Sequence, residues 1–138
     1  MRTLKITGLM VAAIMLAPAL IAGAHESHEP HVYFIQPVDG ATTGREVEVV
    51  MGVSGMQIHA AGELIAGTGH HHLIIDGSYI PKGETVPKDA THRHFGKGQT
   101  EATIQLSPGK HVLTLQFADG HHGSYGKAMS KTVHITVR

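Results

Sequence analysis

Apolar side chains recur at every second position from 47 to 53 in REVEVVMGV, residues 45–53. The apolar residues at 47, 49, 51 and 53 fall on one face of an extended chain, while Glu46 and Glu48 fall on the other. This period of two predicts a half-buried β-strand and argues against a helix.

Five further segments have strand character and are bounded by turn residues such as Asp39-Gly40 and Ser107-Pro108-Gly109. No segment after residue 24 has a convincing helical period. Short strands at this spacing predict an all-β domain, an antiparallel β-sandwich of immunoglobulin or fibronectin type. The chain lacks the Cys-Trp-Cys signature of true immunoglobulin domains, because it has neither Cys nor Trp. The five additional predicted strands span residues 32–36, 69–76, 100–106, 110–119 and 132–137.

The first 24 residues have the features of a signal peptide. Arg2 and Lys5 form a basic start, residues 6–16 are apolar, Pro18 ends the apolar run, and Ala22-Gly23-Ala24 is a small-residue cleavage site. We therefore expect cleavage after Ala24 and a periplasmic protein. Residues 25–31 would then form a His-rich N-terminal arm and residues 32–138 the β-sandwich domain. The alternative is an uncleaved membrane anchor over residues 6–24.

The composition of the mature chain excludes several classes of protein. Without Arg2 and Lys5, 9 Lys and Arg face 11 Asp and Glu, so the basic patch of a nucleic-acid-binding protein is not expected. No stretch after residue 24 is apolar enough to predict a membrane span. The absence of Cys excludes thiolate metal sites, which leaves imidazole, carboxylate, thioether and backbone ligands.

Histidine is the outstanding residue: the chain has 13, all after residue 24. His70 and His72 lie two apart in a predicted strand, so their side chains project from the same face. His92 and His94 repeat this spacing in the long predicted loop before the fourth strand, and His122 follows the fifth. Imidazole suits zinc, copper and nickel, so we predict that these five residues bind a metal ion.

His25 is a separate candidate ligand. Cleavage after Ala24 would make it the N-terminal residue, whose amine and ring nitrogen can chelate one ion together. This arrangement resembles the histidine brace of periplasmic copper-resistance chaperones and copper polysaccharide oxygenases. The resemblance implies a copper site that a second His would complete.

Three stretches carry a wider resemblance: GHHHLIIDG at 69–77, HRHFGKGQTEATIQLSPGKHVLTLQFAD at 92–119 and SKTVHITV at 130–137. They are similar to a bacterial exported family known as domain of unknown function 4399, across nearly all of residues 31–138. The resemblance implies an exported β-sandwich and assigns no activity or site.

The leading hypothesis is a periplasmic metal-binding protein that acts as chaperone, buffer or sensor, with copper as the first candidate ion and zinc as the second. Another exported protein is a possible partner. The alternative is a metal-free interaction module whose surface His residues respond to pH. We expect no enzyme, because neither H-E-x-x-H nor G-x-S-x-G occurs.

Overall fold

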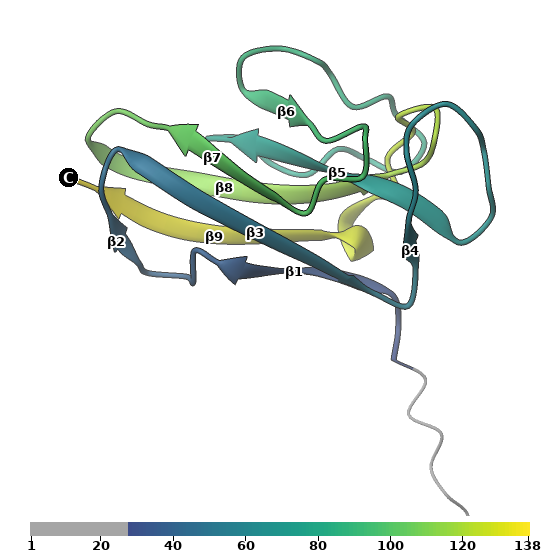
Figure 1. Ribbon diagram of the computed structural model, residues 1–138, viewed down its shortest axis with the longest axis horizontal. Helices are drawn as coiled ribbons and strands as arrows, with labels where there is room; N and C mark the ends of the chain where they lie inside the picture. Colours follow the sequence, from purple (N-terminus) through teal and green to yellow (C-terminus); the bar gives the residue numbers. More distant parts are fainter. Residues whose placement is uncertain (1–27) are drawn as a thin grey trace, which may run out of the picture.

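The computed structural model describes residues 28–138, so the predicted signal peptide and His25 lie outside the described part of the chain. The described residues form two β-sheets that pack face to face (Figure 1). This confirms the all-β class and the antiparallel sandwich. The more specific immunoglobulin or fibronectin type stays a prediction.

One sheet has three strands in the order β1-β3-β7, and the other has the order β2-β9-β8-β5-β4, with β6 also paired to β5. All pairings are antiparallel except those of β2 with β9 and β4 with β5. A 3-10 helix, η1 (Lys127–Met129), precedes the last strand. The strands are β1 (His31–Gln36), β2 (Thr42–Thr43), β3 (Glu46–Ser54), β4 (Gln57–Ile58), β5 (Thr68–Ile75), β6 (His92–His94), β7 (Glu101–Gln105), β8 (Gly109–Ala118) and β9 (Ser130–Val137).

The core lies between the two sheets and follows the alternation of the sequence. Val47 and Val49 of β3 are buried there, as are Leu115 and Phe117 of β8 and Ile135 of β9. Glu46 and Glu48 face outward, as the period of two predicts. Burial of apolar side chains from both sheets provides the main stabilisation of a domain that has no Cys for disulfides.

Strand β5 differs from the other strands because all of its residues are buried. Leu73 and Ile75 face the core between the sheets. The opposite face carries His70, His72 and Ile74, and residues that follow β5 and β8 in the chain cover it. The outer face of β5 and β8 is therefore also buried, and many of the side chains on it are polar.

The segments that follow β5 and β8 form a cover over this face, and hydrogen bonds hold the cover on the sheet. The side-chain oxygen of Gln116 accepts from the backbone N–H of Ile80, at 2.9 Å. The hydroxyl of Thr114 donates to the carbonyl of Gly77, and that of Ser124 donates to the carbonyl of Ile80. These contacts fix the long connection from β5 to β6 and so position β6 against β5. Among residues 28–138, none of the helical structure is long or apolar enough to cross a membrane.

Candidate metal centre

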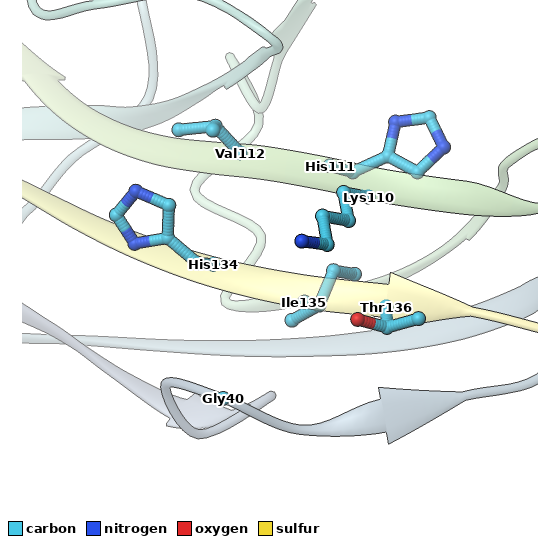
Figure 2. A pocket seen from close by; sticks show the side chains of 7 residues that line it. All are labelled: Gly40, Lys110, His111, Val112, His134, Ile135 and Thr136. Carbon is cyan, nitrogen blue, oxygen red and sulfur yellow. The ribbon is translucent and has the colours of Figure 1, made fainter.

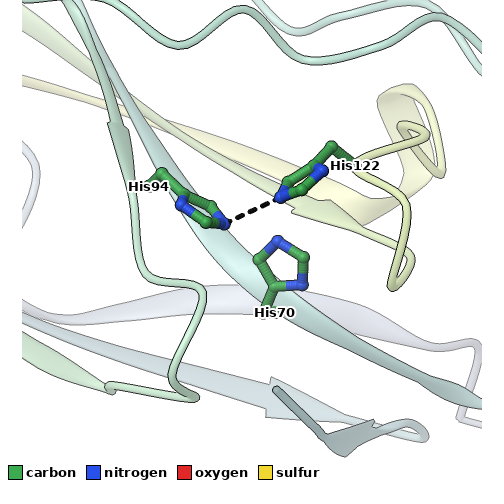
Figure 3. Close-up of side chains that lie close together, drawn as sticks. All are labelled: His70, His94 and His122. Atoms are coloured by element: carbon green, nitrogen blue, oxygen red, sulfur yellow. Dashed lines mark hydrogen bonds between the residues drawn. The ribbon is translucent and has the colours of Figure 1, made fainter. Parts of the chain in front are cut away.

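Four imidazoles converge on the outer face of β5. His70 and His72 come from β5, His94 from β6 and His122 from the loop after β8. Nε2 of His70 lies 3.0 Å from Nε2 of His72, and Nε2 of His94 lies 3.0 Å from Nε2 of His122. All pairs of ring centroids are 4.6–5.9 Å apart. Figure 3 shows a ring nitrogen of His70 directed at the His94–His122 pair. We call these four residues the histidine cluster.

The register of the sheet explains why His94 belongs to the cluster. β6 pairs antiparallel with β5, and this register places His94 directly opposite His72. Gly96 then lets the His94 ring lie against the backbone, because a Cβ at position 96 would collide with that ring. The glycine after this strand is thus required by the position of the imidazole.

His122 lies in a tight turn that follows β8. Its φ is 67°, in the left-handed region that residues other than glycine rarely adopt. The carboxylate of Asp119 accepts hydrogen bonds from the backbone N–H groups of His121 and Gly123, both at 2.9 Å. The N–H of His122 donates to the carbonyl of Asp119. Asp119 therefore shapes the loop that directs His122 into the cluster.

The electrostatics of the cluster favour neutral imidazole. Burial, reinforced by the positive charges of neighbouring His residues, lowers the pKa of His70 to about 4 and that of His72 to about 3. Burial also lowers the pKa of His94, with smaller effects from His122 and Lys88. Neutral imidazole is the form that coordinates a metal ion, so these ligands need not lose a proton at neutral pH.

Within the histidine cluster, two buried ring nitrogens have no hydrogen-bond partner among residues 28–138: Nδ1 of His70 and Nδ1 of His72. The two side chains are only 0% and 1% exposed. An unsatisfied buried polar atom costs about 1–3 kcal/mol. The fold therefore holds these imidazoles in place at a cost in free energy, which is typical of a functional site.

The spacing within each of the two Nε2 pairs fits a small four-coordinate ion. Nitrogens bound at about 2.0–2.1 Å around a tetrahedral centre lie roughly 3.3 Å from one another. The two Nε2 pairs at 3.0 Å are within a few tenths of an ångström of that value. One ring nitrogen from each of His70, His94 and His122 also lies within 4.8 Å of the other two. The cluster could hold a metal ion.

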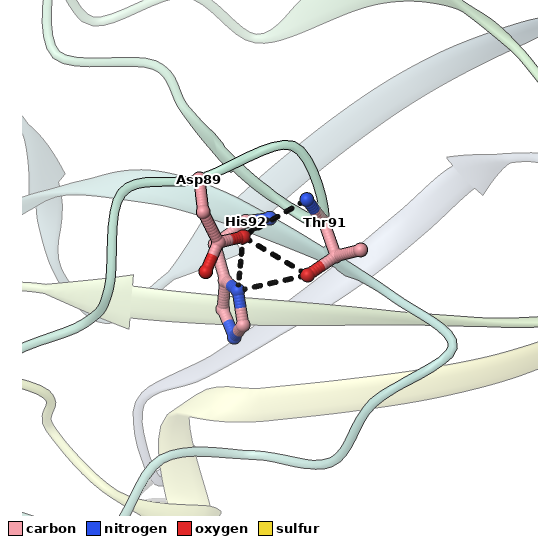
Figure 4. Close-up of polar contacts among 3 residues, drawn as sticks. All are labelled: Asp89, Thr91 and His92. Carbon is pink, nitrogen blue, oxygen red and sulfur yellow. Dashed lines mark hydrogen bonds and ion pairs between the residues drawn. The ribbon is translucent and has the colours of Figure 1, made fainter.

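His92 lies two residues before His94, the same spacing as that between His70 and His72, but the structure does not bring it into the cluster. It sits opposite Ile74, and its Nδ1 lies 2.8 Å from the carboxylate of Asp89. Figure 4 shows that Thr91 shares the same carboxylate oxygen. Of the six predicted ligands, the structure thus brings together four, places His92 apart, and leaves His25 outside the described residues.

His71 faces the opposite way from its two neighbours. Its ring packs edge-on against Phe117 with centroids 5.2 Å apart, inside the core between the sheets. Neither ring nitrogen has a partner within the described residues, and burial lowers its pKa to about 4. Alternation along β5 separates His71 from the cluster, as expected for three consecutive residues on a strand.

Three acidic residues close in sequence to the predicted ligands or strands have roles outside the cluster. Asp76 binds Nδ1 of His111 at 2.9 Å, Glu101 is exposed on β7, and Asp119 holds its turn. A separate cavity of about 440 Å³ on the outer face of β8 and β9 is lined by His111, His134 and Lys110 (Figure 2). Neither of these His residues reaches the histidine cluster.

The fold and the site define a β-sandwich protein with a buried, all-imidazole cluster that could hold a metal ion. A family model described as "Domain of unknown function (DUF4399)" matches residues 49–138, and the chain belongs to this family. The matched segment contains all four residues of the histidine cluster. Comparison with curated proteins and with solved structures gave no match.

Proposed function

We propose that the protein binds one transition-metal ion through His70, His72, His94 and His122, and that it does so in the periplasm as a chaperone, buffer or sensor. The observation that carries the proposal is the convergence of imidazoles from three separate segments: one ring nitrogen from each of His70, His94 and His122 lies within 4.8 Å of the other two. Nε2 of His72 lies 3.0 Å from Nε2 of His70. The features of a cleaved signal peptide in residues 1–24 support the location.

The donor set limits the choice of ion. Four imidazoles offer nitrogen only, and Ca²⁺ and Mg²⁺ prefer oxygen ligands. Among divalent ions, Cu²⁺ generally binds nitrogen sites most tightly, and Zn²⁺ favours the tetrahedral arrangement that the Nε2 spacing fits. Copper is therefore our first candidate and zinc our second.

The burial of the ligands suggests how an ion reaches them. His70 and His72 form the floor of the site at 0% and 1% exposure, while His94 and His122 are only half-buried. An ion would meet His94 and His122 first and then the two β5 residues. A site that is open on one side suits an ion that must be taken up and released.

The test is a titration of chelator-treated mature protein with Cu²⁺ and with Zn²⁺, including competition between the two. We expect one ion per chain. His122→Gln removes one half-buried ligand and should weaken binding about 10–100-fold, since three imidazoles then remain. His121→Gln, next to it in the same loop but exposed, is the matched control and should bind like the wild type. Equal affinity of the His122 variant and the wild type would contradict the proposal.

A second arm separates the cluster from the predicted brace at His25. Protein with one extra residue before His25 loses the brace but keeps the cluster. Binding that survives this extension and is lost in His72→Gln assigns the ion to the cluster. Binding that is lost only on extension would assign it to His25 and overturn the cluster as the site.

A further inference from the structure

An open cleft of about 470 Å³ adjoins the histidine cluster. It lies between β6 and β7, which belong to different sheets, so it opens at an edge of the sandwich. Lys88, His92, Arg93 and His94 form part of its lining. His94 therefore borders both the cleft and the cluster.

The charge of this cleft favours anions. Lys88 and Arg93 are exposed, and neither is in an ion pair among the described residues. Asp89 is the acidic residue of the lining, and its carboxylate already accepts hydrogen bonds from the backbone and side chain of Thr91 and from His92 (Figure 4). The cleft is thus lined by two unpaired cations, while the carboxylate of Asp89 is already hydrogen-bonded within its own loop.

The His94 ring connects this cleft to the metal centre. Its Nε2 faces His122, and its Nδ1 lies on the side of the ring away from His122 (Figure 3). No acceptor for Nδ1 is found within residues 28–138. When Nε2 of a neutral imidazole coordinates a metal, Nδ1 carries the proton, and metal-bound His residues almost always donate it to a carboxylate, a carbonyl or water.

We propose that the cleft binds a small oxyanion, foremost a carboxylate, held by Lys88 and Arg93, and that this anion accepts the Nδ1 proton of His94. Arg93 can present a bidentate donor pair to a carboxylate, and Lys88 adds a point charge. The link to the metal rests on the proposed function, whereas anion binding by Lys88 and Arg93 does not require a metal. An anion at His94 would orient the imidazole and make it a stronger ligand, so the two ligands should bind cooperatively.

The first test uses metal-free protein, with succinate and sulfate titrated separately by calorimetry at low ionic strength. We expect saturable binding that weakens as salt is added. Lys88→Gln/Arg93→Gln should weaken it at least about tenfold, because two charge-assisted contacts are lost. Lys110→Gln, a change of the same type at the separate cavity on β8 and β9, should have no effect. Tighter binding of succinate supports a carboxylate ligand, and tighter binding of sulfate supports an inorganic oxyanion. Failure of both, or equal binding by the double variant, overturns the cleft as an anion site.

The second test repeats the titration on zinc-loaded protein, since zinc has no redox chemistry to complicate it. The anion should bind several-fold more tightly than to metal-free protein, and zinc should bind more tightly by the same factor in the presence of the anion. The double variant should lose this coupling while still binding one zinc ion. Independent binding of the two ligands overturns the contact at His94. If neither zinc nor copper binds, the proposed function fails, and the metal-free titration still decides whether the cleft binds anions.

Discussion

At the scale of single residues, the position of the His94 ring depends on residue 96 being glycine, which has no side chain. A Cβ at residue 96 would collide with this ring, so Gly96→Ala should push His94 out of the cluster. We expect metal affinity to fall about 10–100-fold, and metal-free stability to fall by only about 1 kcal/mol. Metal titration and urea unfolding measure the two effects separately.

The matched control is Gly44→Ala, because a Cβ there would have no neighbour within 4 Å. This variant should keep wild-type metal affinity. Unchanged affinity in Gly96→Ala would mean that the His94 ring is not a ligand, or that it moves freely enough for its position to be unimportant.

The residue scale also shows where sequence spacing stops being informative. His92 and His94 have the same spacing as His70 and His72, yet Asp89 binds His92 while His94 joins the cluster. The spacing predicts which face a side chain takes, but not which partner lies opposite. That partner depends on the register of β6 against β5, and the register is a tertiary feature.

At the scale of elements, the six longer strands could be predicted from the sequence, and the short strands β2, β4 and β6 could not. The predicted segment 45–53 corresponds to β3, and 132–137 corresponds to β9. Apolar and polar residues alternate in these strands because one face of each strand packs against the core. β5 is buried on both faces, and nothing in its own residues shows that the chain after it folds back as a cover. The sequence predicts a loop where the structure has β6, because three polar residues show no apolar period.

A contact between the ends of β5 and β8 gives a prediction on pH. His111 has an acceptor at each ring nitrogen: the carboxylate of Asp76 at 2.9 Å and the carbonyl of Ser107 at 2.8 Å. The hydrogen bond to Asp76, followed by that to Ser107, raises the pKa of His111. Its contribution to stability is therefore fully present below pH 6.5, its ordinary value, and is lost as the pH rises through the raised pKa.

In metal-free protein, the free energy of unfolding should accordingly fall by about 0.5–1 kcal/mol above pH 6.5, the size expected of a partly exposed ion pair. His111→Gln should be less stable near pH 6.5 and should lose this decline. The buried His residues do not interfere here, because their lowered pKa values affect stability only below pH 6.5. A wild type and variant with parallel stability curves would show that His111 is not charged in the folded protein.

At the scale of the whole molecule, the histidine cluster joins parts of the chain that are distant in sequence. His70 and His72 lie on β5, His94 lies on β6 after the long connection from β5, and His122 follows β8. An ion bound to all four would fasten the cover to the sheet. Because the unfolded chain cannot hold these ligands together, metal binding should appear as stability of the fold.

At a free ion concentration 100 times Kd, this coupling is worth about 2.7 kcal/mol, which corresponds to roughly 10 °C in Tm for a domain of this size. Adding chelator to metal-loaded protein should lower Tm by that amount, and the amides of residues 119–123 should lose protection from hydrogen exchange, since the ion would bind His122 in addition to the backbone hydrogen bonds of this loop. His122→Gln, which should bind about 10–100-fold more weakly, should show a smaller response to chelator, about 0.4–1.4 kcal/mol at the same ion concentration. A metal-free interaction module, the alternative function, predicts no response in either protein. A wild-type Tm that is the same with ion and with chelator would therefore favour that alternative and leave the buried imidazoles as a structural cost without a ligand.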